Sequence, residues 1–468
     1  MNAVHPSLSR LKQAPFWQEI TPRVECAPLT HDATVDLLVV GGGFTGLWTA
    51  IEAKLASPNA SVMLVDARVV GGQASGRNGG FIHATLTHGF ANGMSRWPDE
   101  YPRLHKLGTE NLAYIRNFVR ERKLECNWLD AGELEIARQD HEFAGLEELH
   151  ASLRELDPEL ELLSGEQMKQ RISSDAFVGA LFDPRGVATL NPTALAQGLL
   201  REALREGVVV HERSELISLR SRHGAMECQV RTAASTHVIG AKHIALAMNA
   251  FRSPIAAVRR RIAPVYDYAI VTEPLSQAQW ESVGWSGHEG GVETSNLFHY
   301  FRRTPDGRIL WGGYDAEYHW RNATGEQFEA NQDCFNRLAV SFFETFPQLD
   351  GITFDFGWGG AIDTCSRFSP FWGTAFQGKV AYVAGFTGLG VGSSRFGALT
   401  MLDLLSGNET ERTKLKMVRE KPMPYPPEPF RSAAIAVTKW SLARADRKRG
   451  SRNLWLRLLD SLGVGFDS

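Results

Sequence analysis

Apolar runs and helical patterns alternate along the first part of the chain. Residues 35–40 (VDLLVV) form a continuous apolar run, which is typical of a strand buried on both faces of a parallel sheet. Residues 44–56 (FTGLWTAIEAKLA) have apolar side chains at helical spacing, and residues 61–65 form a second apolar run. The pattern therefore predicts a strand–helix–strand unit.

Charged helical patterns such as NLAYIRNFVRERKL (111–124) replace these runs after residue 90. The expected elements that follow are strands at 134–137, 208–219, 243–250 and 266–275, a helix at 192–207, a hairpin at 296–313 that turns at Pro305-Asp306-Gly307, and a strand–glycine–helix segment at 379–405. This order predicts an α/β fold in which a mixed sheet with helices interrupts a Rossmann-like domain.

We place the domain boundaries where the pattern changes. The expected parts are an N-terminal lead-in (1–31), a discontinuous domain that contains the strand–helix–strand unit (32–90, 186–256 and 352–421), an inserted domain (91–185 and 257–351), and a proline-rich linker with a helical tail (422–468). Ligands bind at the carboxyl ends of strands in such sheets, so the site is expected between the two domains.

Composition narrows the class of protein. The chain has 468 residues with 50 basic and 53 acidic side chains, so no global charge favours nucleic acid. Its five cysteines are scattered without a C-x-x-C pair, which argues against a disulfide framework or a metal site. We find no signal-peptide pattern and no apolar run long enough for a membrane span. The expectation is a cytoplasmic protein.

The turn after the first apolar run reads Gly41-Gly42-Gly43-Phe44-Thr45-Gly46 and matches G-x-G-x-x-G. It follows a predicted strand, opens a predicted helix, and has Asp66 twenty residues beyond its last glycine, a context that predicts dinucleotide binding. Gly41 permits the turn, Gly43 admits the pyrophosphate and Gly46 lets helix and strand pack. Asp66 is expected to bind the adenosine ribose.

A second glycine-rich loop, GGQASGRNGG (71–80), follows this acid. Ordering so many glycines loses much conformational entropy, so the loop is expected to lie against a ligand. A flavin that runs past this loop explains it better than a nicotinamide does.

With these two motifs the chain resembles the D-amino-acid-oxidase-like FAD superfamily (the D-amino-acid-oxidase/glutathione-reductase-2 type of fold), and most of all the γ-glutamylputrescine oxidase and aminophosphonate oxidoreductase branch. The resemblance extends to ALAMNAF, to the substrate-domain strands and to YVAGFTGLGVGSSRFG. It implies that the discontinuous domain is the FAD-binding domain and that the inserted domain is the substrate domain. It also implies FAD contacts from Gly41, Gly43, Phe44, Thr45, Gly46, Asp66, Ala67, Ala74, Ser75, Gly76, Arg77, Asn78, Gly79, Gly80, Leu216, Ala247, Asn249, Gly360, Gly388, Leu389, Gly390 and Val391.

Two positions depart from the family pattern. Leu389 stands where the family's last glycine motif usually has histidine, and Ala361 stands where related enzymes have the cysteine that tethers the flavin. The resemblance therefore implies noncovalent FAD. A tether through His83, just after the glycine loop, is the alternative.

The family's Y-x-R strand aligns with Tyr300 and Arg302, which strand alternation puts on one face. We expect Arg302 to bind an anionic group of the substrate, with a structural ion pair as the alternative. Tyr268 and His83 are further candidate catalytic residues.

The resemblance implies FAD-dependent oxidation of a primary or secondary amine (an amino acid, polyamine derivative or aminophosphonate) to an imine, with O₂ or another electron acceptor. The alternatives are a hydroxy-substrate dehydrogenase and a flavin-binding subunit that acts with a partner. The basic tail is expected to pack on the protein, with a membrane-surface helix as its alternative.

Overall fold

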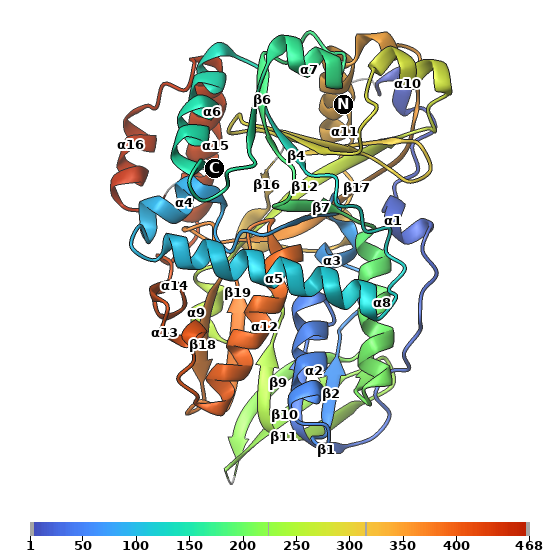
Figure 1. Cartoon of the computed structure of the whole chain (residues 1–468). Coiled ribbons are helices and arrows are strands. Elements are labelled where there is room, and N and C mark those ends of the chain that lie inside the picture. Colours follow the sequence, from blue (N-terminus) through green and yellow to red (C-terminus); the bar gives the residue numbers. More distant parts are fainter. Residues whose placement is uncertain (1–3, 223, 314–315, 465–468) are drawn as a thin grey trace.

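Two large sheets dominate the molecule. The structure is a computed structural model and describes residues 4–222, 224–313 and 316–464. Figure 1 shows one sheet in the lower half and the other in the upper half, with helices on their outer faces. Across the described ranges, every helix is too short or too polar to cross a bilayer.

The first sheet has eight strands and contains the predicted strand–helix–strand unit. Its core runs β18-β19-β11-β1-β2-β8, and β10 and β9 extend from β11. Pairing is parallel between β1 and its neighbours β11 and β2. The strands are β1 (Ala33–Val40), β2 (Val62–Val65), β8 (Val209–His211), β9 (Glu215–Arg222), β10 (Ala225–Arg231), β11 (Thr236–Leu246), β18 (Phe371–Ala375) and β19 (Val380–Ala384).

The second sheet has nine strands, in the order β16-β12-β15-β14-β13-β4-β6-β5, and β17 pairs with β12. Its strands are β4 (Glu133–Ala137), β5 (Glu161–Ser164), β6 (Gly179–Asp183), β12 (Ala263–Thr272), β13 (Gly290–Glu293), β14 (His299–Arg303), β15 (Ile309–Gly313), β16 (Glu317–Tyr318) and β17 (Phe354–Thr364). The predicted hairpin is confirmed as β14–β15, and Gly307 in its turn has a φ of +79°. A short pair, β3 (Phe81–His83) and β7 (Val187–Thr189), lies outside both sheets.

Helices cover these sheets. They are α1 (Phe16–Glu19), α2 (Phe44–Ala56), α3 (Ala74–Arg77), α4 (Gly89–Arg96), α5 (Tyr101–Glu121), α6 (Asp140–Leu153), α7 (Gly165–Arg171), α8 (Pro192–Arg205), α9 (Ala256–Arg259), α10 (Gln277–Val283), α11 (Gln332–Thr345), α12 (Gly390–Ser406), α13 (Glu411–Lys414), α14 (Lys416–Arg419), α15 (Phe430–Arg447) and α16 (Leu454–Ser461). The predicted helices at 44–56 and 192–207 are confirmed as α2 and α8.

Three segments differ from the expected organisation. Helix α5, expected with the substrate domain, buries Leu112 and Ile115 in the core that surrounds α2. Strand β17, expected with the FAD-binding domain, pairs along its whole length with β12 of the nine-stranded sheet. The run at 208–219 is two strands, because the main-chain N–H groups of Arg213 and Ser214 bond to the 66–68 segment instead of continuing β8.

Candidate functional site

A cavity of about 1580 Å³ is walled by residues of both sheets. It brings together many of the expected site residues, although their roles stay predictions. On its wall are Phe44, Thr45, Ala74, Ser75, Arg77, Asn78, Gly79, His83, Asn249, Tyr268, Tyr300, Gly360, Gly388, Leu389, Gly390 and Val391. The cavity thus extends from the start of α2 to the loop before α12.

The first glycine turn lies beside this cavity and has the geometry that the motif requires. Gly41 has a φ of +104°, and a Cβ there would lie 2.3 Å from the carbonyl oxygen of Ala247. A Cβ on Gly46 would lie 1.8 Å from the carbonyl oxygen of Gly41, so glycine lets α2 approach the end of β1. The carboxylate of Asp66 accepts the main-chain N–H of Gly42 at 2.6 Å and that of Arg68 at 2.7 Å.

The start of α2 fits the pyrophosphate of FAD. Gly43 has an ordinary φ of −80°, but a Cβ there would lie 2.8 Å from the Oγ of Ser75. That Oγ accepts the main-chain N–H of Phe44 at 2.9 Å, and Gly43 offers no side-chain cap to the helix. Phe44 and Thr45 of the first turn line the cavity, so the N–H groups and the positive dipole end of this helix start suit an anion bound there.

The other expected cofactor residues are not on the cavity wall. Leu216 is the second residue of β9 and packs on the core under β1 and β2. It follows Ser214, whose main-chain N–H bonds to the carbonyl of Asp66. Four more residues that were expected to contact the cofactor are likewise not on the wall: Ala67, Gly76, Gly80 and Ala247.

Two side chains of the second glycine loop hold the loop rather than point freely into the cavity. The guanidinium of Arg77 pairs with Glu329 at 2.6 Å and donates to the carbonyl of Gly72 at 2.8 Å. The amide of Asn78 donates to the carbonyls of Ala74 and Ser75 and accepts the N–H of Gly80. The loop therefore presents mainly its backbone to a ligand.

The N-terminal lead-in, expected to be irregular, also supports this loop. The indole N–H of Trp17 donates to the carbonyl of Asn78 at 3.0 Å, and the amide of Gln18 donates to the carbonyl of Gly72 at 3.0 Å. The glycine loop is thus held from a segment that precedes the dinucleotide motif.

Arg302 does not have the position that was expected of it. Its guanidinium donates to the carbonyls of Gly80 and Leu190, at 2.9 and 2.8 Å, and lies 5.3 Å from the ring of Trp17. The residue is 3% exposed and is not on the cavity wall, and burial lowers its pKa to about 9. These contacts favour a structural role for Arg302, and its binding of a substrate anion stays a prediction.

The two candidate tyrosines are on the wall, and each hydroxyl has a partner. Tyr300 donates to the carboxylate of Asp267 at 3.0 Å, and Tyr268 donates to the carbonyl of Phe328 at 2.9 Å. Burial raises the pKa of both phenols, so neither is an acid near neutral pH. They can orient a ligand.

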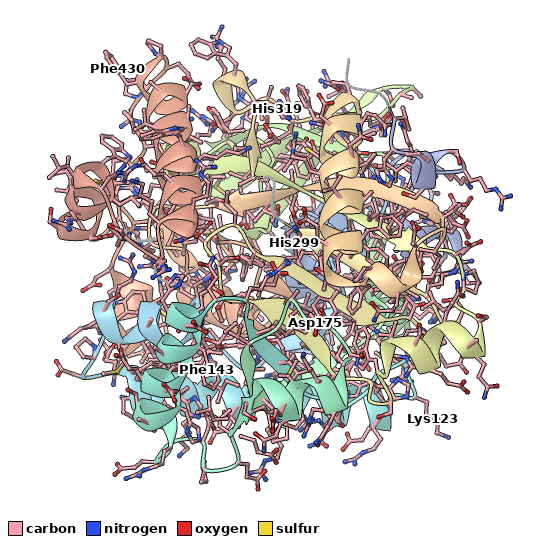
Figure 2. All side chains as sticks on the ribbon, turned by 90° about the horizontal axis from the view of Figure 1, so that it is seen from above. Lys123, Phe143, Asp175, His299, His319 and Phe430 are labelled. Carbon is pink, nitrogen blue, oxygen red and sulfur yellow. The ribbon has the colours of Figure 1, made fainter. Side chains whose placement is uncertain are left out.

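The most polar part of the wall lies around His83. The imidazole Nε2 of His83 lies 3.1 Å from the carboxylate of Glu133. Burial lowers the pKa of His83, but Glu133 offsets this effect and the net pKa lies above its ordinary value. Figure 2 labels His299, on β14 of the same sheet as Glu133, near the centre of the molecule.

Glu135 lies two residues further along β4 and is on the same face of the strand as Glu133. Within the described chain its carboxylate has no hydrogen bond or ion pair. Burial, and then the charges of Glu133 and Asp183, raise its pKa to about 7. Asp183 itself accepts the N–H groups of Arg185 and Gly186. Glu135 is therefore a proton acceptor on the cavity wall near neutral pH.

The cationic side chains on the wall are, in contrast, already paired with carboxylates. Five such pairs are present: Arg77–Glu329, Lys106–Glu110, Arg116–Asp130, Arg185–Glu159 and Lys439–Glu317. The local charge near His83 is consequently negative, which favours a cationic ligand. Over the ranges that the structure describes, His, Cys, Asp and Glu form no group suited to a metal ion.

The loop before α12 is held by Asp363. Its carboxylate accepts the N–H of Gly385 at 2.6 Å, and burial raises its pKa to about 6. The neighbouring wall carries Leu389 and Ala361, at the positions where the resemblance led us to look for a histidine and a tethering cysteine. All five cysteines are free and buried.

Glu133, Glu135 and Asp363 did not figure in the sequence-based expectations. The alternation of ELEIA contained a signal for the first two, because it puts both glutamates on the face opposite Leu134 and Ile136. Asp363 had no such signal, since its partners are main-chain groups more than twenty residues away.

Comparison with known proteins agrees with this geometry. The profile of the FAD dependent oxidoreductase family matches residues 36–404. The chain is 29% identical over 396 residues to a gamma-glutamylputrescine oxidoreductase of Escherichia coli K12, covering 81% of this chain and 85% of that protein. It is 27% identical over 394 residues to a probable oxidoreductase, OrdL, of Haemophilus influenzae, covering 82% and 85% of the two chains. Glycine oxidase from Geobacillus kaustophilus has the same fold, with a TM-score of 0.69 at 18% identity over 84% of this chain and all of that one.

Proposed function

The chain belongs to the FAD dependent oxidoreductase family. We propose that, as a member of this family, it oxidises a cationic amine to an imine, which water then hydrolyses. One observation carries the proposal: the unpaired carboxylate of Glu135, with a pKa of about 7, on a cavity wall whose lysine and arginine side chains are all paired. An amine is the substrate class that needs both a negative site to bind its ammonium form and an acceptor for the proton.

The acidic groups first bind the substrate. An ammonium group near Glu135 is attracted by Glu133 and Asp183, and the mostly apolar cavity wall strengthens this attraction by lowering the local dielectric. The pairing of Glu133 with His83 at 3.1 Å fixes the direction of its carboxylate. The relative named for gamma-glutamylputrescine supports an amine substrate as well.

Glu135 then removes a proton. Only the uncharged amine gives up a hydride equivalent readily, so the ammonium must be deprotonated before oxidation. A carboxylate with a pKa of about 7 holds a proton far better than an ordinary glutamate does, which suits general-base work near neutral pH. When bound, FAD supplies the two-electron acceptor for the hydride equivalent from the carbon beside nitrogen.

Other residues position the reactants. The backbone of the 71–80 loop, the start of α2 and the loop held by Asp363 would bind FAD noncovalently, because Ala361 and the buried cysteines offer no tether. Tyr300 and Tyr268 line the part of the cavity next to Gly79 and Gly360 and would orient the amine chain.

Anaerobic titration of the purified holoprotein tests this function. Diamines and other amines without an acidic group should bleach the flavin absorbance and yield an aldehyde with ammonia or amine. Amino acids and aminophosphonates should react more slowly, since their anions meet the acidic wall. Bleaching by hydroxy acids and none by any amine would contradict the proposal, and no reduction by either class would favour a subunit that acts with a partner.

A further inference from the structure

The outer surface of the C-terminal helices is rich in exposed apolar side chains. Of nineteen large hydrophobic side chains exposed in the described ranges, seven lie between residues 423 and 462. On α15, Phe430, Val437 and Trp440 are 67%, 44% and 58% exposed; on α16, Leu454 and Leu458 are 84% and 50% exposed. Such a concentration marks an interaction surface.

These side chains form a stripe on each helix. Phe430, Val437 and Trp440 recur at the spacing of one face of α15, and Leu454 and Leu458 are one turn apart on α16. The inner sides of the helices pack together through Leu442, Ala445 and Leu456. Figure 1 shows both helices at one side of the molecule, and Figure 2 shows Phe430 at the outer end of α15.

The rest of the protein holds this surface in place. The carboxylate of Asp446 accepts the N–H groups of Asn296 and Leu297, at 3.1 and 3.2 Å, and Arg96 donates to the carbonyl of Gly463 at 2.6 Å. Trp455 and Leu459, on the inner side of α16, reach the wall of the cavity. The two apolar stripes are therefore preformed rather than dependent on a partner for folding.

The same segment is strongly basic. Residues 430–463 contain eight Lys and Arg against two Asp, whereas the whole chain has 50 basic and 53 acidic side chains. Within the described structure the side chains of Arg444, Arg447, Lys448, Arg449 and Arg457 have no hydrogen bond or ion pair. The surface thus combines exposed apolar groups with unpaired positive charge.

We propose that this surface, formed by the outer faces of α15 and α16, docks the protein on a membrane surface that contains acidic phospholipids. A symmetric contact with a second copy would bring the basic segment against itself, and that contact is electrostatically unfavourable. Leucine side chains that project singly, with arginines beside them, suit insertion among acyl chains below anionic headgroups. A protein partner would instead favour a groove or a flat apolar patch.

Vesicle flotation of the full-length holoprotein tests this docking. We expect binding to phosphatidylcholine vesicles with about 30 mol% phosphatidylglycerol at about 0.05 M salt, and loss of binding at about 0.5 M, where charge is screened within a few ångströms. Arg444→Glu/Arg447→Glu/Arg457→Glu and, separately, Leu454→Ser/Leu458→Ser should each lower the bound fraction about tenfold or more.

The control is Ile217→Ser/Val340→Ser, which removes two exposed apolar side chains (42% and 47%) elsewhere on the surface. It should bind vesicles like the parent protein, and flavin content reports the folding of every variant. Equal binding to neutral vesicles, or unchanged binding of the two tail variants, would overturn the proposal. So would a dimer in light scattering that the tail substitutions dissociate, because the surface would then be occupied by a second copy.

Discussion

At the scale of single residues, Glu135 and Arg302 show how charge is distributed at the candidate site. The carboxylate lies on the cavity wall without a partner, and the guanidinium lies behind the wall with carbonyl partners. The positive group that was expected to select an anion is thus away from the cavity, and a negative group that was not expected lines it.

We predict that Glu135→Gln removes a proton acceptor. In the parent protein the rate of flavin reduction should fall as the pH falls through about 7, because protonated Glu135 accepts no further proton. In the variant the rate at pH 8 should be lower by roughly 10²–10⁴-fold, the usual effect of a general base. Anaerobic stopped-flow measurements across the pH range check this, with Glu110→Gln, at the cavity rim, as the control.

The same substitution should stabilise the protein in alkaline solution. The pKa of Glu135 rises from an ordinary 4.5 to about 7 in the folded state. The stability that comes with its proton is therefore complete below pH 4.5 and is lost as the pH rises through 7. Glutamine avoids that loss, so Glu135→Gln should raise Tm at pH 8 and change it little at pH 4.5. The upper bound on the gain in free energy of unfolding is about 3.5 kcal/mol, at ~1.4 kcal/mol per pKa unit. If Glu135→Gln raised Tm more at pH 4.5 than at pH 8, the pKa of Glu135 would not be raised in the folded state.

Arg302 could be placed on its strand from the sequence, but its partners could not. Alternation put it correctly on a face with Tyr300, yet the carbonyls of Gly80 and Leu190 belong to segments more than a hundred residues away. Sequence patterns describe the face of a strand and not the main chain that packs against it.

Arg302→Ala should consequently act on stability and on flavin retention together. Two charge-assisted hydrogen bonds at ~1.5–3 kcal/mol each would be lost. We therefore expect the free energy of unfolding, measured by chemical denaturation, to fall by about 3 kcal/mol or more. Arg303→Ala is the neighbouring control, because its bonds go to Trp285 and Gly287, away from the glycine loop. A variant with full stability and only a raised KM would return Arg302 to the role of an anion site.

At the scale of elements, the junction of β1, the glycine turn and α2 follows closely from the sequence. The apolar run, the glycines and the helical period all act within 25 residues, so local physics determines them. Strand β17 was assigned to the other domain because its partner β12 lies about ninety residues earlier, and no local signal records such a pairing.

Gly43→Ala tests the fit of this junction to FAD. The backbone there suits any residue, so the added methyl acts only through the 2.8 Å contact with the Oγ of Ser75, beside the space for the pyrophosphate. We expect the purified variant to contain markedly less FAD, with the Tm of the apoprotein nearly unchanged. Gly145→Ala, in α6 where a Cβ meets nothing within 4 Å, is the matched control and should keep full FAD. Stoichiometric FAD in Gly43→Ala would place the cofactor elsewhere.

At the scale of the whole molecule, the two sheets share one cavity, and segments from both ends of the chain complete it. The lead-in reaches the glycine loop through Trp17, and the tail reaches the cavity wall through Trp455. Neither contact was predictable, because both terminal segments lack a pattern tied to the dinucleotide motif and lie outside residues 36–404, which the family profile matches.

The fixing of the glycine loop by distant residues also sets an order of events during synthesis. Arg77 donates to the carbonyl of Gly359 and Trp358 donates to the carbonyl of Arg77, across 282 and 281 positions of sequence. At ~5–20 residues per second, these partners leave the ribosome roughly 15–60 s after the loop itself. The nascent first strand–helix–strand unit therefore exists for that time with an unfinished flavin site, and we expect FAD to be incorporated only after about three quarters of the chain has been made.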